Sequence, residues 1–174
     1  MESIVNRVGS LSPASAGDVS DLEKSLFFTS VRQNPVFFIL YSLKESLKGE
    51  SEERIAKALA KASFIMIDGL ESRIRYEMKR GRREALAHKD SANGDSKRQM
   101  DLRNLIQNSY TLFIRRVRRK RDILALILES VERFYEQNRY EELLEIICSG
   151  SRSLAHIDIM ISLYEEEAKY YGTS

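Results

Sequence analysis

The sequence predicts a mainly α-helical protein, a bundle of long amphipathic helices, and three observations predict it. Apolar residues recur every three or four positions over two long stretches, as they do along one face of a helix. Residues that favour helix starts, Pro35 and Ser51, stand where two of the apolar patterns begin. The chain has 174 residues and is 43% hydrophobic, enough to bury a core, and it has no internal repeat of solenoid period.

Two short helices are expected near the N-terminus. The first begins at Ser20, where a glutamate three residues later completes a capping box. The pair Asn34-Pro35 ends it, and Pro35 opens a second helix that stops at Gly49. Small and helix-breaking residues dominate the start of the chain, so residues 1–19 are expected to form a flexible tail.

A third, long helix is expected from a cap at Ser51 to about Leu86. Two glycines, Gly69 and Gly81, interrupt its apolar stripe and predict either a bend or a close contact with another helix. A cluster of small polar residues follows, which predicts an exposed loop over residues 88–97. The stripe itself consists of Ile55, Leu59, Ala62, Met66, Leu70, Ile74 and Met78.

The fourth expected helix starts at Met100 and carries an apolar seam, which is either core or a subunit contact. The seam comprises Leu102, Ile106, Phe113, Val117, Leu124 and Leu128. Beyond Glu129 the pattern suits either helix or short strands, and Gly150 is expected to break the chain before a terminal helix from Leu154 to Tyr171. The predicted organisation is therefore a helical domain over residues 20–122 and a C-terminal segment, 123–174, that is either a small α+β module or further helices.

Charge is segregated along the chain, although its net value is only +2. Residues 73–89 and 97–121 are basic, and residues 129–145 and 165–167 are acidic. Because helical side chains fan around the axis, the cations of one segment cannot all face one surface, and some must pair or be solvated. Two basic clusters are candidates for contact with nucleic acid or with an acidic partner. The basic segment comprises Arg115, Arg116, Arg118, Arg119, Lys120 and Arg121, and the second cluster comprises Lys79, Arg80, Arg82 and Arg83.

The sequence favours no catalytic chemistry. It has no Gly-rich phosphate loop, no nucleophile elbow and no paired histidines on a helix. The single cysteine, Cys148, is expected to be a small buried residue, and with two histidines it forms no metal-ligand spacing. No secretory signal or membrane span is recognisable. We therefore expect a cytoplasmic protein without catalytic residues, cofactor or metal, and without a membrane partner.

The order of these segments resembles the archaeal GINS family, the helical scaffold of the replicative helicase. The stretch Ala62 to Leu86, which ends in basic turns and the pair Ala85-Leu86, is similar to the long helix of that family. Met100-Asp101-Leu102 resembles the start of its next helix, which leads to Arg121-Asp122-Ile123-Leu124. The similarity lies in spacing and residue class over about four-fifths of the chain. It departs from the family where Leu144-Glu145 replaces the expected Gly-Asp turn.

The resemblance implies a helical domain joined to a small β-rich domain, here residues 123–174. It implies a non-enzymatic function: an oligomeric scaffold of a DNA replication complex that links the replicative helicase to other proteins near DNA. The residues alone leave an alternative open, a helical nucleic-acid-binding or regulatory protein that acts through residues 115–121. Both hypotheses expect protein partners or DNA, and the scaffold hypothesis expects a homo- or hetero-oligomer.

Overall fold

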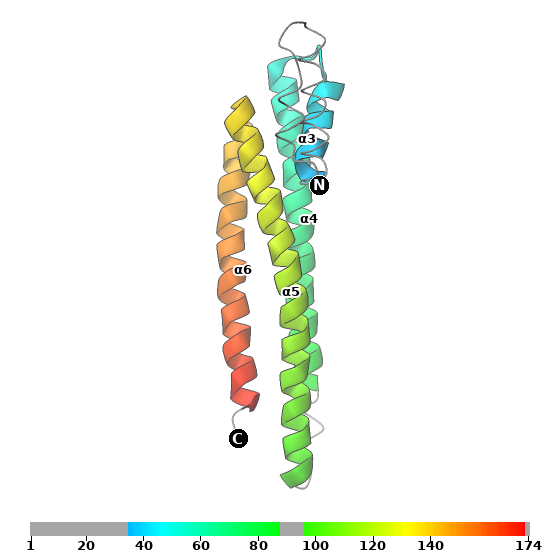
Figure 1. Cartoon of the computed structure of the whole chain (residues 1–174), viewed down its shortest axis with the longest axis vertical. Coiled ribbons are helices and arrows are strands. Elements are labelled where there is room, and N and C mark those ends of the chain that lie inside the picture. Colours follow the sequence, from blue (N-terminus) through cyan, green and yellow to red (C-terminus); the bar gives the residue numbers. More distant parts are fainter. Residues whose placement is uncertain (1–34, 88–95, 173–174) are drawn as a thin grey trace, which may run out of the picture. The chain divides into compact units, whose positions relative to one another are not determined.

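The computed structural model describes residues 35–87 and 96–172, and every regular element in these two ranges is an α-helix (Figure 1). The prediction of a mainly α protein with long helices is confirmed. The chain divides into two compact units, residues 1–50 and residues 51–174. The predicted tail over residues 1–19 and the predicted first helix lie outside the described residues.

Helix α3, Pro35–Ser46, is the described helix of the first unit. Proline suits the first position of a helix because its fixed φ is helical and its missing N–H has no partner to lose there. The chain then turns through Gly49, whose φ of 99° lies in the left-handed region that glycine adopts without steric cost. Both ends of this helix therefore follow the prediction.

Helix α4, Glu52–Ala87, opens the second unit with 36 residues. The backbone N–H of Arg54 donates to Ser51 Oγ at 3.3 Å, so Ser51 is the predicted cap. Within the predicted stripe, Ile55, Leu59, Ile74 and Met78 are buried. The loop expected over residues 88–97 is described only at its end, where Ser96 already belongs to the next helix.

Helix α5, Ser96–Asn138, has 43 residues and continues well beyond Glu129, where the sequence pattern becomes ambiguous. It ends at Arg139, whose φ of 57° is left-handed and whose N–H donates to the Tyr135 carbonyl at 2.7 Å. Val131 and Phe134 of the ambiguous stretch are buried. The strand alternative for this stretch is therefore wrong, because these residues pack as part of a helix.

Helix α6, Glu142–Gly172, has 31 residues and contains Gly150, so the expected break at this glycine is also wrong. Gly150 is buried, and a Cβ on it would lie 2.3 Å from Leu128 Cδ2. The glycine lets α6 approach α5 closely instead of interrupting the helix. Of the two options for residues 123–174, the described part adopts further helices. The predicted boundary between residues 122 and 123 lies inside α5.

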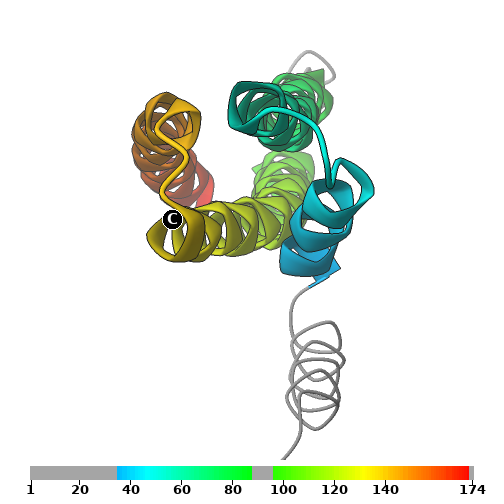
Figure 2. The ribbon, with the colours of Figure 1, turned by 90° about the horizontal axis from the view of Figure 1, so that it is seen from above.

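In the second unit, α5 runs antiparallel to both α4 and α6 and packs against each of them (Figure 1, Figure 2). The α5 seam forms the core, since Ile106, Phe113, Val117, Leu124 and Leu128 are all buried and Leu102 is partly so. At Gly81 a Cβ would meet Phe113 Cγ at 2.4 Å, which makes Gly81 the close helix contact that the sequence predicted as one of two options. Gly69 has open space around it.

Candidate functional site

The basic segment, residues 115–121, lies at the centre of α5, between α4 and α6. Val117 points into the core and is fully buried. The residues next to it in the chain, Arg116 and Arg118, therefore lie on the sides of α5 that face α4 and α6. Four of the six cations form ion pairs with carboxylates of those helices. These four are Arg116, Arg118, Lys120 and Arg121.

Two of these cations join α5 to α6. Arg121 donates from Nε and Nη2 to the two carboxylate oxygens of Asp158, each at 2.7 Å, in the planar two-point geometry that guanidinium and carboxylate share. The hydrogen bond from Arg121 holds the pKa of Asp158 below its usual value. One helical turn earlier on α5, Arg118 pairs with Glu165. These two contacts therefore fix the relative position of α5 and α6.

The other two cations meet α4 at Glu77, a buried carboxylate. Lys120 Nζ donates to Glu77 Oε2 at 2.9 Å, Arg116 Nε lies 3.0 Å from Oε1, and Arg80 Nη2 lies 3.6 Å from Oε1. Burial raises the pKa of Glu77, but the hydrogen bond and charge of Lys120, with the charges of Arg116 and Arg80, outweigh burial and hold that pKa below its usual value. Glu77 therefore remains ionised and brings the two basic clusters together across α4 and α5.

Sequence reasoning missed Glu77, although a signal was present. Its neighbours at the spacing of one helical turn, Ile74 and Gly81, are both buried, so a carboxylate stands on the apolar face of α4. A charge in that position needs a partner, because burying an isolated ion is costly. The sequence could have predicted a buried pair here, but not the three cations that form it.

In the second basic cluster, Arg80 and Arg82 are also engaged. Arg80 pairs with Glu84 on its own helix at 3.2 Å as well as with Glu77. Arg82 donates from Nε and Nη2 to the Glu167 carboxylate of α6, at 3.1 and 3.0 Å. The cluster therefore contributes its own contact between α4 and α6.

Four predicted contact residues are exposed and make no ion pair within the described residues. They are Lys79 and Arg83 on α4, and Arg115 and Arg119 on α5. Lys79 and Arg83 line a hollow between α4 and α6, whereas Arg115 lines a different hollow between α5 and α6. The cations that remain available are therefore divided between separate surfaces.

We expect Arg121→Gln to lower the free energy of unfolding by about 1 kcal/mol at neutral pH, because it removes a two-point ion pair that is only partly exposed. Arg119→Gln is the matched control and is expected to change it by less than about 0.5 kcal/mol. Since the folded pKa of Asp158 is depressed, its contribution is present above the unfolded pKa and is lost as pH falls through the folded one. Urea unfolding at neutral and acidic pH measures both effects, and equal losses for the two variants would contradict the assignment.

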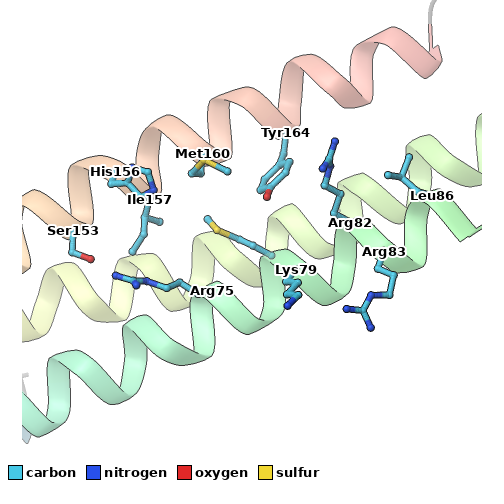
Figure 3. A pocket seen from close by; sticks show the side chains of 11 residues that line it. Arg75, Lys79, Arg82, Arg83, Leu86, Ser153, His156, Ile157, Met160 and Tyr164 are labelled. Atoms are coloured by element: carbon cyan, nitrogen blue, oxygen red, sulfur yellow. The ribbon is translucent and has the colours of Figure 1, made fainter.

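A hollow between α4 and α6 has a volume of about 570 Å³ (Figure 3). On the α4 side it is lined by cations together with Met78 and Leu86, and on the α6 side it is lined by Ile157, Met160 and Tyr164. Figure 3 shows Arg82 and Tyr164 pointing into the space between the two helices. The cations are Arg75, Lys79, Arg82 and Arg83. The hollow thus combines an apolar lining with basic side chains.

His156 and Cys148, the two described residues whose chemistry the sequence raises, are both exposed on α6. His156 is an exposed residue on the lining of the hollow, and no described group of three histidine, cysteine, aspartate or glutamate residues could hold a metal ion. Cys148 is exposed on α6, so its expected burial is wrong: it lies on the side of that helix turned away from the core. None of the described helices is long and apolar enough to cross a membrane.

Comparison of the chain with protein-family models, curated proteins and solved structures found no match. The function of the chain is therefore inferred from its own surfaces.

Proposed function

We propose that this protein is a non-enzymatic helical scaffold that acts through contacts with other protein chains. The observation that supports this most is an apolar stripe on the outer side of α6. Ile159 and Leu163 are 59% and 56% exposed, and their spacing of four residues places them on one side of the helix. The core-facing side of the same helix already holds Ile157 and Ile161.

A helix that is apolar on two opposite sides is typical of one packed between two partners. In this unit α5 packs against one side, and Ile159 and Leu163 on the other side are more than half exposed. Large apolar side chains that recur along one exposed stripe favour a protein contact. The basic segment favours the same conclusion, because most of its cations already serve contacts between helices.

The replication version of this proposal rests on the resemblance to the GINS family. That resemblance expects a small β-rich domain in residues 123–174, and the described part of this segment is helical. The general proposal of a scaffold does not depend on that domain. Identifying the partners in cells tests whether a replicative helicase is among them.

The test is reciprocal affinity capture from native cells, combined with the size of the captured assembly. We expect the wild-type chain to elute in an assembly larger than its own oligomer, with the same partners recovered when those partners carry the tag. Ile159→Ser with Leu163→Ser is expected to reduce partner recovery roughly tenfold, since hot spots in interfaces are few and apolar. Tyr76→Ser, which removes an exposed aromatic ring from α4, is the control.

A chain that elutes only as itself under these conditions would contradict the scaffold proposal. Equal recovery with all variants would contradict the α6 stripe as the contact. A replicative helicase among the partners would support the replication version.

A second candidate, direct binding of nucleic acid, is favoured by one observation. Arg80, Arg116 and Lys120 converge on the single carboxylate of Glu77, so an excess of positive charge remains where α4 meets α5. If nucleic acid binds through the basic segment of α5, Arg115→Gln with Arg119→Gln is expected to weaken binding. The variant should also flatten the salt dependence of binding by up to about two released counterions. Neither residue makes a described ion pair, so this change spares the helix contacts. Unchanged affinity for duplex and single-stranded DNA across a salt series would remove this candidate.

A further inference from the structure

The surface between α4 and α6 is hollowed at two places along its length. The first hollow, of about 570 Å³, lies beside the second half of α4, and the second lies nearer the start of both helices and has a volume of about 450 Å³. The second hollow is lined by Ala60, Lys61 and Phe64 of α4 and by Glu142, Glu145, Ile146 and Ser149 of α6. Because α4 and α6 run in the same direction, the two hollows lie at opposite ends of one surface, which we call the α4/α6 groove (Figure 1).

The two ends of the α4/α6 groove carry opposite charge. The end near Leu86 is lined by four cations and by no aspartate or glutamate. The other end has two glutamates and one lysine in its lining. Lys79 and Arg83 at the basic end, and Glu142 and Glu145 at the acidic end, form no ion pair within the described residues. Glu142 also interacts electrostatically with Lys57, and Lys79, Arg83 and Glu145 carry charge on the same surface without a described ion pair.

Apolar side chains accompany the charges at both ends. Phe64, 57% exposed, and Ile146 line the acidic end, and Met160 and Tyr164 are among the lining of the basic end. A surface with apolar residues along its floor and charges beside them is typical of a protein contact, because burial supplies affinity and the charges set the orientation.

We propose that the α4/α6 groove is the contact surface for a second copy of this chain, placed antiparallel about a twofold axis. Turning the second copy end over end brings its acidic end over the basic end of the first, and the same contact is repeated at the other end. In such an isologous pair each chain supplies both halves of the charge match. This inference rests on the proposed function, since it names the partner of one surface of the scaffold.

The charges favour a second copy over an unrelated helix of uniform charge. An acidic helix matches Lys79 and Arg83 but is repelled by Glu142 and Glu145, and a basic helix meets the reverse problem. A parallel second copy would place like charges together at both ends. Only a partner with the same charge order, read in the opposite direction, matches the whole groove.

The size of the groove agrees with a stable contact. From Ala60 to Leu86 a helix rises about 40 Å, and two adjacent helices together are about 20 Å wide, which gives a face of roughly 800 Å². Standard interfaces bury about that area on each partner. The groove is therefore large enough to form one partner's share of such an interface.

The test is a charge swap in the purified full chain. One variant carries Lys79→Glu and Arg83→Glu, a second carries Glu142→Lys and Glu145→Lys, and a third carries all four changes. Sedimentation equilibrium at micromolar concentrations measures self-association, and circular dichroism checks the fold, because lysines in the first turn of α6 oppose the helix dipole. Arg115→Glu with Arg119→Glu is a control with the same change in net charge as the first variant, made outside the groove.

We expect wild-type chain to be dimeric and each two-residue variant to associate roughly tenfold more weakly or worse, because like charges then face each other at both ends. A mixture of the two variants should form a heterodimer, and the four-residue variant should recover the homodimer, since both restore opposite charges at both ends. The control should remain dimeric.

Three results would overturn the inference: a wild-type monomer at these concentrations, an unaffected Lys79→Glu/Arg83→Glu dimer, or a mixture that associates no better than its components. The first of these variants changes residues without described ion pairs, so the test does not depend on the second variant folding. A wild-type monomer that still joins a larger assembly in cells would refute the second-copy contact and leave the scaffold proposal intact.

Discussion

Glu77→Ala is expected to lower the free energy of unfolding by about 3 kcal/mol, because it removes one partner of a buried group of charges. The side chain is buried where α4 meets α5, and its carboxylate is shared by Lys120, Arg116 and Arg80. Removing it leaves Arg116 and Lys120 without their ion-pair partner and Arg80 paired only with Glu84. Urea unfolding followed by circular dichroism measures the loss.

Glu77→Gln separates the charge of this side chain from its shape. We expect it to destabilise the protein at neutral pH as well, but by less than the alanine change. The folded pKa of Glu77 is depressed, so its charge stabilises the fold above the unfolded pKa, and that contribution is lost as pH falls through the folded pKa. The difference between wild type and Glu77→Gln should therefore shrink on acidification.

Glu84→Gln is the matched control for Glu77. Glu84 also pairs with Arg80, at 3.2 Å, but its side chain is 54% exposed, so the change is expected to cost less than about 0.5 kcal/mol. Similar losses for Glu77→Gln and Glu84→Gln, or a Glu77→Gln difference that grows in acid, would contradict the role given to Glu77.

Gly81→Ala is expected to lower the free energy of unfolding by about 2 kcal/mol, although alanine is the better helix former. A Cβ at this position would lie 2.4 Å from Cγ and 2.5 Å from Cβ of Phe113, so α4 and α5 must separate to admit it. Phe113 is fully buried and cannot simply swing away. For a chain of this size we expect the melting temperature to fall by roughly 6 °C.

Gly69→Ala on the same helix is the control, because its added methyl group meets nothing within 4 Å. At this position only the higher helix propensity of alanine acts, and we expect the free energy of unfolding to rise by up to about 1 kcal/mol. Opposite signs for the two glycines would support the close contact at Gly81. A gain at both positions would show that α4 and α5 do not approach each other there.

Sequence reasoning succeeded where local signals and packing agree. The helices α3 and α4 were predicted together with their starts, because Pro35 and Ser51 act within one turn of the backbone they affect. The apolar seam of α5 was predicted as a set, since a spacing of three and four residues defines one side of a helix whatever covers it. Gly81 was predicted as one of two positions for a close contact.

Sequence reasoning failed where the structure of a residue depends on a contact with another helix. Gly150 has the local signature of a break, but contact with Leu128 of α5 makes it part of a helix. Val131 and Phe134 suit a strand as well as a helix, and their burial in the core decides the matter. Cys148 was expected inside because of its residue type and lies outside because of its position on α6.

For the candidate site, the sequence by itself determined that the basic segment is helical, that its cations point in several directions, and that some of them must pair. Only the tertiary structure decided which cations pair and with which carboxylates. Arg116 and Lys120 pair with Glu77, Arg118 with Glu165 and Arg121 with Asp158. The physical reason is that periodicity fixes the direction of a side chain around its own helix axis, whereas a charge pair also depends on the register between two helices. That register is set by close contacts such as Gly81 with Phe113, which join residues far apart in the chain.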